Sequence, residues 1–92
     1  MGSAVAVFID ELIRDNPNVL ATLQVMRERG LSLDESREEI GLAFLGCLWE
    51  MEKGLPNRWL QALHGLREGR SAAEQFPEYL LSMGGRPLIQ EL

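Results

Sequence analysis

Residues 32–53, SLDESREEIGLAFLGCLWEMEK, decide the fold of this 92-residue chain. Ser32 and Glu35 have the spacing of a capping box, in which each side chain accepts a hydrogen bond from the backbone amide of the other residue. At the other end, Lys53 favours the C-terminus of a helix and Gly54 ends it. The stretch therefore predicts one long helix over residues 33–53.

This predicted helix carries apolar side chains on two opposite faces when its residues are placed at about 100° intervals. The face expected to point into the core holds Ile40, Ala43, Phe44, Cys47, Leu48 and Met51. The opposite face holds Leu42, Leu45 and Trp49, and residues 40–49 contain no charged side chain. A helix that is apolar all round is normally buried on all sides.

Two arrangements would bury the second face. Either other helices of the same chain cover it, or Leu42, Leu45 and Trp49 stay exposed and bind a second chain or another protein. Gly41 and Gly46 each cost about 1 kcal/mol of helix propensity. We expect that cost to be offset by another helix lying close to this part of the chain.

Four further helices are expected around the central one, over residues 4–14, 17–29, 57–68 and 72–83. Asn16 is a good N-cap and Pro17 fits the first helical position. Pro77 has no amide hydrogen, so it either kinks the last helix or restarts it. The expected inner-face residues are Val5, Phe8, Ile9, Leu12 and Ile13; Val19, Leu20, Leu23 and Met26; Trp59, Leu60, Leu63 and Leu66; and Phe76, Tyr79, Leu80 and Met83.

The sequence thus predicts a single all-α domain over residues 1–92, a compact bundle of four to five helices around residues 33–53. Residues 1–3 and 86–92 are expected to be irregular ends. In the second of these, Leu88, Ile89 and Leu92 would dock the tail on the bundle. No apolar run is long enough to span a membrane and no targeting signal is recognised, so we expect a cytoplasmic protein.

Composition excludes several classes of function. The chain has 9 basic and 14 acidic residues, a net charge of −5, which argues against binding to nucleic acid backbones. One Cys and one His exclude an internal disulfide and a Cys-rich or multi-His metal centre. We therefore expect no metal and no cofactor.

The sequence offers two candidate chemical groups. The acidic residues Asp34, Glu35, Glu38 and Glu39 suit the positive end of a helix dipole, and we interpret them as a solvated helix N-terminus. Cys47 and His64 have the residue types of a nucleophile and its base. Because Cys47 lies on the expected inner face and His64 on the periphery, we predict no catalytic site and no enzyme activity.

Two alternative functions are considered. A small-ligand pocket between helices would use the large apolar groups Met26, Phe44, Met51, Trp59 and Phe76, with His64 or Tyr79 as a polar anchor. A helix-turn-helix DNA reader over residues 19–41 would place an acidic helix in the major groove, and residues 31–53 carry two basic and six acidic side chains. It would need a basic patch built from Arg58, Arg67, Arg70 and Arg86.

A family resemblance follows from Asn16-Pro17-Asn18-Val19, Gly30-Leu31-Ser32 with Asp34-Glu35, Ile40-Gly41 and Leu48-Trp49-Glu50. This layout, over residues 16–66, resembles small bacterial all-helical proteins of unknown function. Those proteins often have a His-Glu pair and a later His, where this chain has Asp34-Glu35 and Arg37-Glu38. The resemblance implies a helical fold and a bacterial cytoplasmic setting, and no activity.

The function we expect is protein–protein interaction, as a homodimer or by docking to another protein through Leu42, Leu45 and Trp49. Aromatic side chains are enriched among the residues that dominate binding energy, so Trp49 would anchor the contact. The acidic ends of the same helix would bias the choice of partner towards basic surfaces.

Overall fold

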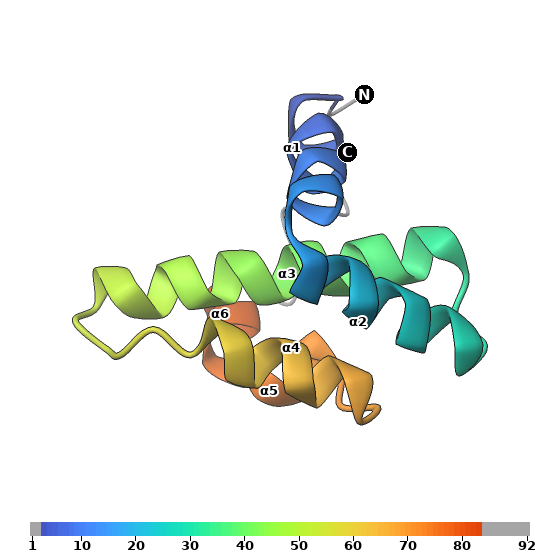
Figure 1. Ribbon diagram of the computed structural model, residues 1–92. Helices are drawn as coiled ribbons and strands as arrows, with labels where there is room; N and C mark the ends of the chain where they lie inside the picture. The colour runs from blue at the N-terminus through green and yellow to red at the C-terminus, as the bar shows by residue number, and fades with distance from the viewer. Residues whose placement is uncertain (1–2, 84–92) are drawn as a thin grey trace.

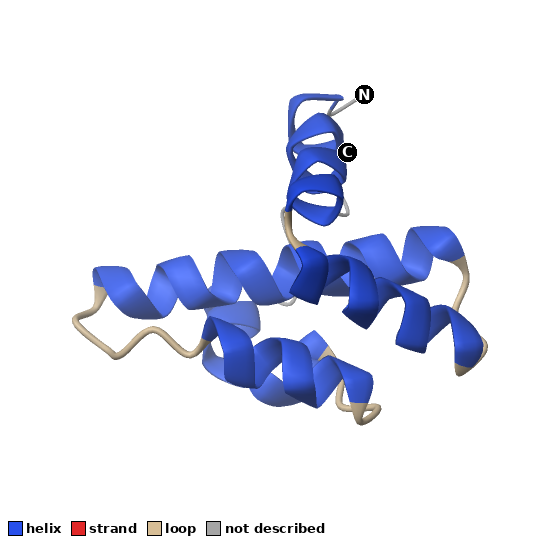
Figure 2. Cartoon of the chain, viewed as in Figure 1, coloured by secondary structure: helices blue, strands red, loops and turns tan. Residues whose placement is uncertain are grey.

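The computed structural model describes residues 3–83, without the side chains of residues 3–6, and it contains six helices and no strand over that range. These are α1 (Ser3–Asp15), α2 (Pro17–Glu28), α3 (Leu33–Glu52), α4 (Trp59–Arg67), α5 (Ala72–Gln75) and α6 (Pro77–Ser82). Figure 2 shows the helices and the loops that join them. The expected contacts of Val5, Leu88, Ile89 and Leu92 lie outside the described residues.

α3 is the central element of the fold, as the sequence predicts. It contacts α1, α2, α4, α5 and α6, and α2 also packs against α1 and α4. Figure 1 shows α2 and α4 alongside α3, whereas α1 rises away from these three helices. The radius of gyration is 12.3 Å, close to the value of about 12 Å expected for a compact chain of this length. The prediction of a compact all-α fold around α3 is confirmed.

The helix ends are set by local sequence. In the capping box of α3, the amide of Glu35 donates to Ser32 Oγ over 3.0 Å, and the amide of Ser32 donates to Glu35 Oε1 over 2.9 Å. Ser71 and Glu74 form a second capping box before α5. Gly54, after α3, has a φ of +83°, a backbone conformation that favours glycine. Asn16 is the N-cap of α2, but its side chain makes no capping hydrogen bond.

Two expected helices have different bounds in the structure. α4 begins at Trp59 rather than residue 57, because the backbone of its N-cap residue, Arg58, lies outside the helical region at φ −122° and ψ 37°. Asn57 Oδ1 accepts the Trp59 amide over 3.0 Å. The last helix is divided into α5 and α6, because the backbone of Phe76 leaves the helical region at φ −130° and ψ 57° and Pro77 starts a new helix. Of the two outcomes expected at Pro77, the structure has the restart.

The core follows most of the expected inner faces but not all of them. The buried apolar residues are Ile9, Ile13, Val19, Met26, Ile40, Leu42, Ala43, Cys47, Ala62, Leu63, Leu66, Ala72, Phe76 and Tyr79. Phe8, Leu20 and Leu60 were expected among them, but all three are exposed, Leu60 by 64%. Small residues are buried in place of the two leucines: Thr22 on α2, whose hydroxyl accepts a hydrogen bond from Arg67 of α4, and Ala62 and Gly65 on α4, the latter facing Gln75 of α5.

Gly46 marks the closest approach to α3. A side-chain carbon built at this position would lie 2.6 Å from Cγ of Phe76, far inside van der Waals contact. Phe76 is among the largest fully buried side chains of the described residues. The expectation that a neighbouring element lies close to Gly46 is confirmed, and that element is the junction of α5 and α6.

We predict that Gly46→Ala lowers the free energy of unfolding by about 1–3 kcal/mol, because the added methyl group overpacks the Phe76 ring. Helix propensity alone would predict the opposite sign, a gain of about 1 kcal/mol. Gly65→Ala is the comparison variant and should lose less, since the nearest atoms to its new methyl group belong to the terminal amide of Gln75, which can rotate away by giving up its hydrogen bond to the Ala62 carbonyl. Urea denaturation of both variants makes the measurement, and a stabilised Gly46→Ala protein would contradict the packing described.

Candidate functional site

The three residues expected to form an interface are partly or fully covered by the chain itself. Leu42 is 4% exposed and belongs to the core. Leu45 and Trp49 are partly buried against the core, and the Trp49 ring lies 6.0 Å from the ring of Tyr79 in α6. Of the two arrangements considered for this face, the structure has the first at Leu42, because α5 and α6 fold back over this side of α3. An interface role for Leu45 and Trp49 stays a prediction.

The exposed apolar residues of α3 lie on the face that was expected to be internal. Leu48 and Met51 are 42% and 46% exposed, and they continue the stripe of Phe44 at i+4 and i+7. The expected burial of Leu48 and Met51 is wrong, because the C-terminal end of α3 extends beyond the helices that cover the rest of it (Figure 1). This end of α3 therefore presents apolar side chains to solvent.

Aromatic rings extend this stripe onto the neighbouring elements. The ring of Phe44 lies 5.1 Å from that of Phe8 in α1 and 5.5 Å from that of Trp59, with an edge-to-face angle of 88° in the second pair. These distances are typical of favourable aromatic pairs. Phe8 is exposed, and Phe44 and Trp59 are half-buried. The rings thus join α1, α3 and the start of α4.

An open groove lies where α3 passes into α4. Its lining residues are Glu50, Leu55, Pro56, Asn57, Arg58, Trp59, Leu60 and Gln61. Leu55 and Trp59 bring apolar side chains to this groove, and Leu55 is exposed. We define the apolar surface as Phe8, Phe44, Leu48, Met51, Leu55 and Trp59.

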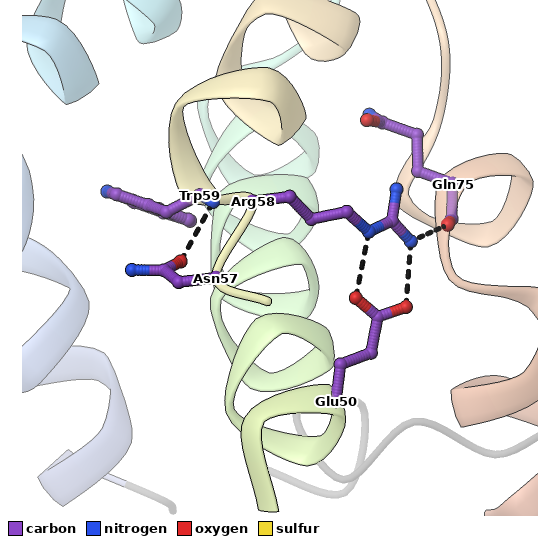
Figure 3. A network of polar contacts seen from close by, with 5 residues as sticks. All are labelled: Glu50, Asn57, Arg58, Trp59 and Gln75. Carbon is purple, nitrogen blue, oxygen red and sulfur yellow. Dashed lines mark hydrogen bonds and ion pairs between the residues drawn. The ribbon is translucent and has the colours of Figure 1, made fainter. Parts of the chain in front are cut away.

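One polar network fixes the position of this groove (Figure 3). Arg58 Nε and Nη2 donate to the two carboxylate oxygens of Glu50, each over 2.8 Å, and Nη2 also donates to the backbone carbonyl of Gln75 over 2.6 Å. The Arg58 guanidinium lies over the ring of Phe76, 4.2 Å from its centroid. Arg58 therefore ties the start of α4 to both α3 and the end of α5.

The hydrogen bonds of Arg58 lower the pKa of the Glu50 carboxyl, and the same contact raises the pKa of Arg58. A second ion pair, between Arg37 Nη2 and Asp10 Oδ1 at 3.0 Å, joins α3 to α1. Two of the carboxylates near the apolar surface, Asp10 and Glu50, are thus each bound by an arginine.

Cys47 and His64, the candidate nucleophile and base, have different environments in the structure. Burial raises the pKa of the Cys47 thiol to about 11, so the thiolate form is scarce at neutral pH. His64 is exposed and lies 3.2 Å from Glu68. Among the described residues, no hydrogen bond joins Cys47 to His64.

Two of the acidic residues at the start of α3 accept hydrogen bonds from backbone amides. Glu35 belongs to the capping box, and Glu39 Oε1 accepts the backbone amide of Ala72 over 2.6 Å. Within residues 3–83, no group of three or more His, Cys, Asp or Glu side chains is placed to hold a metal ion. The contact between Glu39 and α5 was not foreseen, because residues 33 positions apart share no local signal.

A cavity of about 270 Å³ lies between the end of α2, the start of α3 and the loop before α5. Glu35, Glu39 and Arg70 line it, and each already has a partner within the chain. Neither His64 nor Tyr79, the expected polar anchors of a ligand, lines it, and His64 instead lines a separate open hollow with Gln61, Arg70 and Glu74. The structure adds no support to a small-ligand site at this place.

The arginines of a supposed DNA-binding patch are also bound within the chain. Arg58 binds Glu50, Arg67 Nη1 donates to Thr22 Oγ1 over 2.7 Å, and Arg70 binds Glu68. Arg86 lies outside the described residues. The three described arginines thus each have an internal partner, which weakens the case for a phosphate-binding patch.

Comparison with known proteins adds no relative. No protein-family model, curated protein or solved structure matches this chain. In the part of the chain that the structure describes, no helix is both long and apolar enough to cross a membrane. The functional argument therefore depends on the apolar surface and its surroundings.

We predict that acid weakens the fold through Glu50. Its pKa is lowered in the folded protein, so its contribution to stability is present above the ordinary pKa and is lost as the pH falls through the folded value. Urea denaturation measures the free energy of unfolding between about pH 6 and about pH 3. At the upper pH this free energy should be clearly lower for Glu50→Gln than for the wild type, and the difference should shrink as the pH falls.

Glu78→Gln is the control for this titration, because Glu78 is exposed and has no ion pair among the described residues. Its difference from the wild type should be small and independent of pH. A constant difference between the wild type and Glu50→Gln across the same range would show that the Glu50–Arg58 pair does not carry the pH dependence.

Proposed function

We propose that this protein is a protein–protein interaction module, and that the apolar surface is where its partner binds. The observation that carries the proposal is the continuity of this surface over α1, α3 and the α3–α4 loop. Small soluble proteins rarely expose contiguous apolar patches without a binding role. Phe44 and Trp59 give the surface half-buried aromatic anchors of the kind enriched at interfaces.

The surface is held in a fixed shape, which favours binding. Arg58 is adjacent to Trp59 and is fixed by Glu50 and Gln75. Asn57 caps the amide of Trp59 itself. Because these side chains are already ordered in the free protein, little conformational entropy is lost when a partner docks against them. The flexible side chain of Met51 supplies an adaptable contact beside the rigid rings.

Site-specific photo-crosslinking in the cells that make the protein tests this proposal. A photoreactive benzoylphenylalanine replaces Leu48, and in a separate variant it replaces Leu81, which is 76% exposed on α6. We expect discrete covalent adducts from position 48 and not from position 81, because only the former lies on the apolar surface.

A second substitution checks that the adducts depend on the same surface. Met51→Ser should reduce the yield from position 48 several-fold, whereas Leu20→Ser, on the exposed edge of α2, should leave it unchanged. No adduct from position 48, or equal yields from both positions, would refute the proposal. An adduct of twice the chain mass and an adduct of any other defined mass both support it.

A further inference from the structure

The proposed binding role leaves the kind of partner open, and the charges beside the apolar surface restrict it. Glu11 is three residues after Phe8 on α1, and Glu52 is four residues after Leu48 on α3. Residues at these spacings are neighbours on a helix surface, with Cβ atoms about 5–6 Å apart. Each of the two helices thus places a carboxylate directly beside the apolar surface.

These two carboxylates differ from the other charges nearby. Asp10 is bound by Arg37 and Glu50 by Arg58, so those pairs contribute no net charge. Glu11 and Glu52 are exposed and have no ion pair among the residues that the structure describes. The nearby cation Lys53 lies over the Trp49 ring instead, with its Nζ 4.6 Å from the ring centroid, so the unpaired charges on the side of the apolar surface are the carboxylates of Glu11 and Glu52.

The shape of the surface indicates which kind of segment it accommodates. Phe44, Leu48 and Met51 form a stripe along α3, about 10 Å long at 1.5 Å per residue. Phe8 of α1 and Trp59 both pack against Phe44 at one end of this stripe, and Leu55 follows the helix at the other end. An amphipathic helix uses anchors at i, i+3, i+4 and i+7, which span a comparable length.

From these observations, and resting on the proposed function, we propose that the apolar surface binds an amphipathic helix of another protein that carries Lys or Arg on either side of its apolar stripe. Basic side chains at those positions would meet Glu11 and Glu52. A second copy of this chain would instead bring the same carboxylates together, and like charges facing each other oppose association.

The test uses two synthetic helical peptides with the same leucine stripe. In one peptide all remaining positions are lysine, and in the other they are all glutamate. Fluorescence anisotropy of the labelled peptides measures binding to the full chain. We expect the leucine–lysine peptide to bind, with an affinity that falls as salt is added. The leucine–glutamate peptide should bind at least about tenfold more weakly.

Matched charge variants separate the local effect from net charge. The double variant Glu11→Gln and Glu52→Gln should weaken binding of the leucine–lysine peptide by about fivefold. The double variant Glu28→Gln and Glu78→Gln removes the same charge from exposed positions on α2 and α6, and it should leave the affinity unchanged. If the two double variants lose the same affinity for the leucine–lysine peptide, the inference is overturned.

Matched apolar variants test the stripe itself. Leu48→Ser combined with Met51→Ser should weaken binding at least about tenfold, whereas Leu20→Ser combined with Leu81→Ser should have little effect. Thermal unfolding followed by circular dichroism verifies the fold of each variant. If the first pair fails to fold, the glutamate-to-glutamine variants still decide the question.

The outcomes separate this inference from the function on which it rests. An adduct of twice the chain mass from position 48 supports an interaction module and overturns the basic-helix partner. Equal binding of the two peptides also overturns the partner while leaving the interaction role intact. Absence of any adduct from position 48 overturns both.

Discussion

The ring of Phe76 occupies the space beside Gly46 that a side chain on α3 would otherwise fill, and much of the fold depends on this contact. It brings the junction of α5 and α6 against the centre of α3. The guanidinium of Arg58 covers the same ring and binds both Glu50 and the carbonyl of Gln75. One buried ring and one arginine thereby hold the ends of α3, α4 and α5 together.

This arrangement covers the two sides of α3 unequally. Because the chain turns back at Pro77, α6 brings Tyr79 against Trp49, and Leu42 lies in the core. On the opposite side of α3, the rings of Phe8 and Trp59 contact Phe44, whereas Leu48 and Met51 beyond it stay exposed. The apolar surface is thus a consequence of where the second half of the chain folds.

The errors of the sequence prediction have a common physical origin. Periodicity distinguishes apolar from polar faces, and it correctly predicts that Val19, Met26, Leu63 and Leu66 are buried. It does not show how close two helices approach. The buried Thr22 of α2 and the buried Ala62 and Gly65 of α4 are residues that a hydrophobic pattern does not mark, and Leu20 and Leu60 stay exposed instead. The polar contacts of Arg58 and Glu39 were missed because they join segments distant in sequence.

The sequence by itself determined the helical class, the long central helix, both capping boxes and the glycine-ended turns, because these depend on interactions within a few residues of each other. It also showed that α3 is apolar on two faces. Only the tertiary structure decided which face is covered. That choice depends on the contact between Phe76 and Gly46, 30 positions apart, and no local pattern encodes which side of a doubly apolar helix a distant segment will pack against.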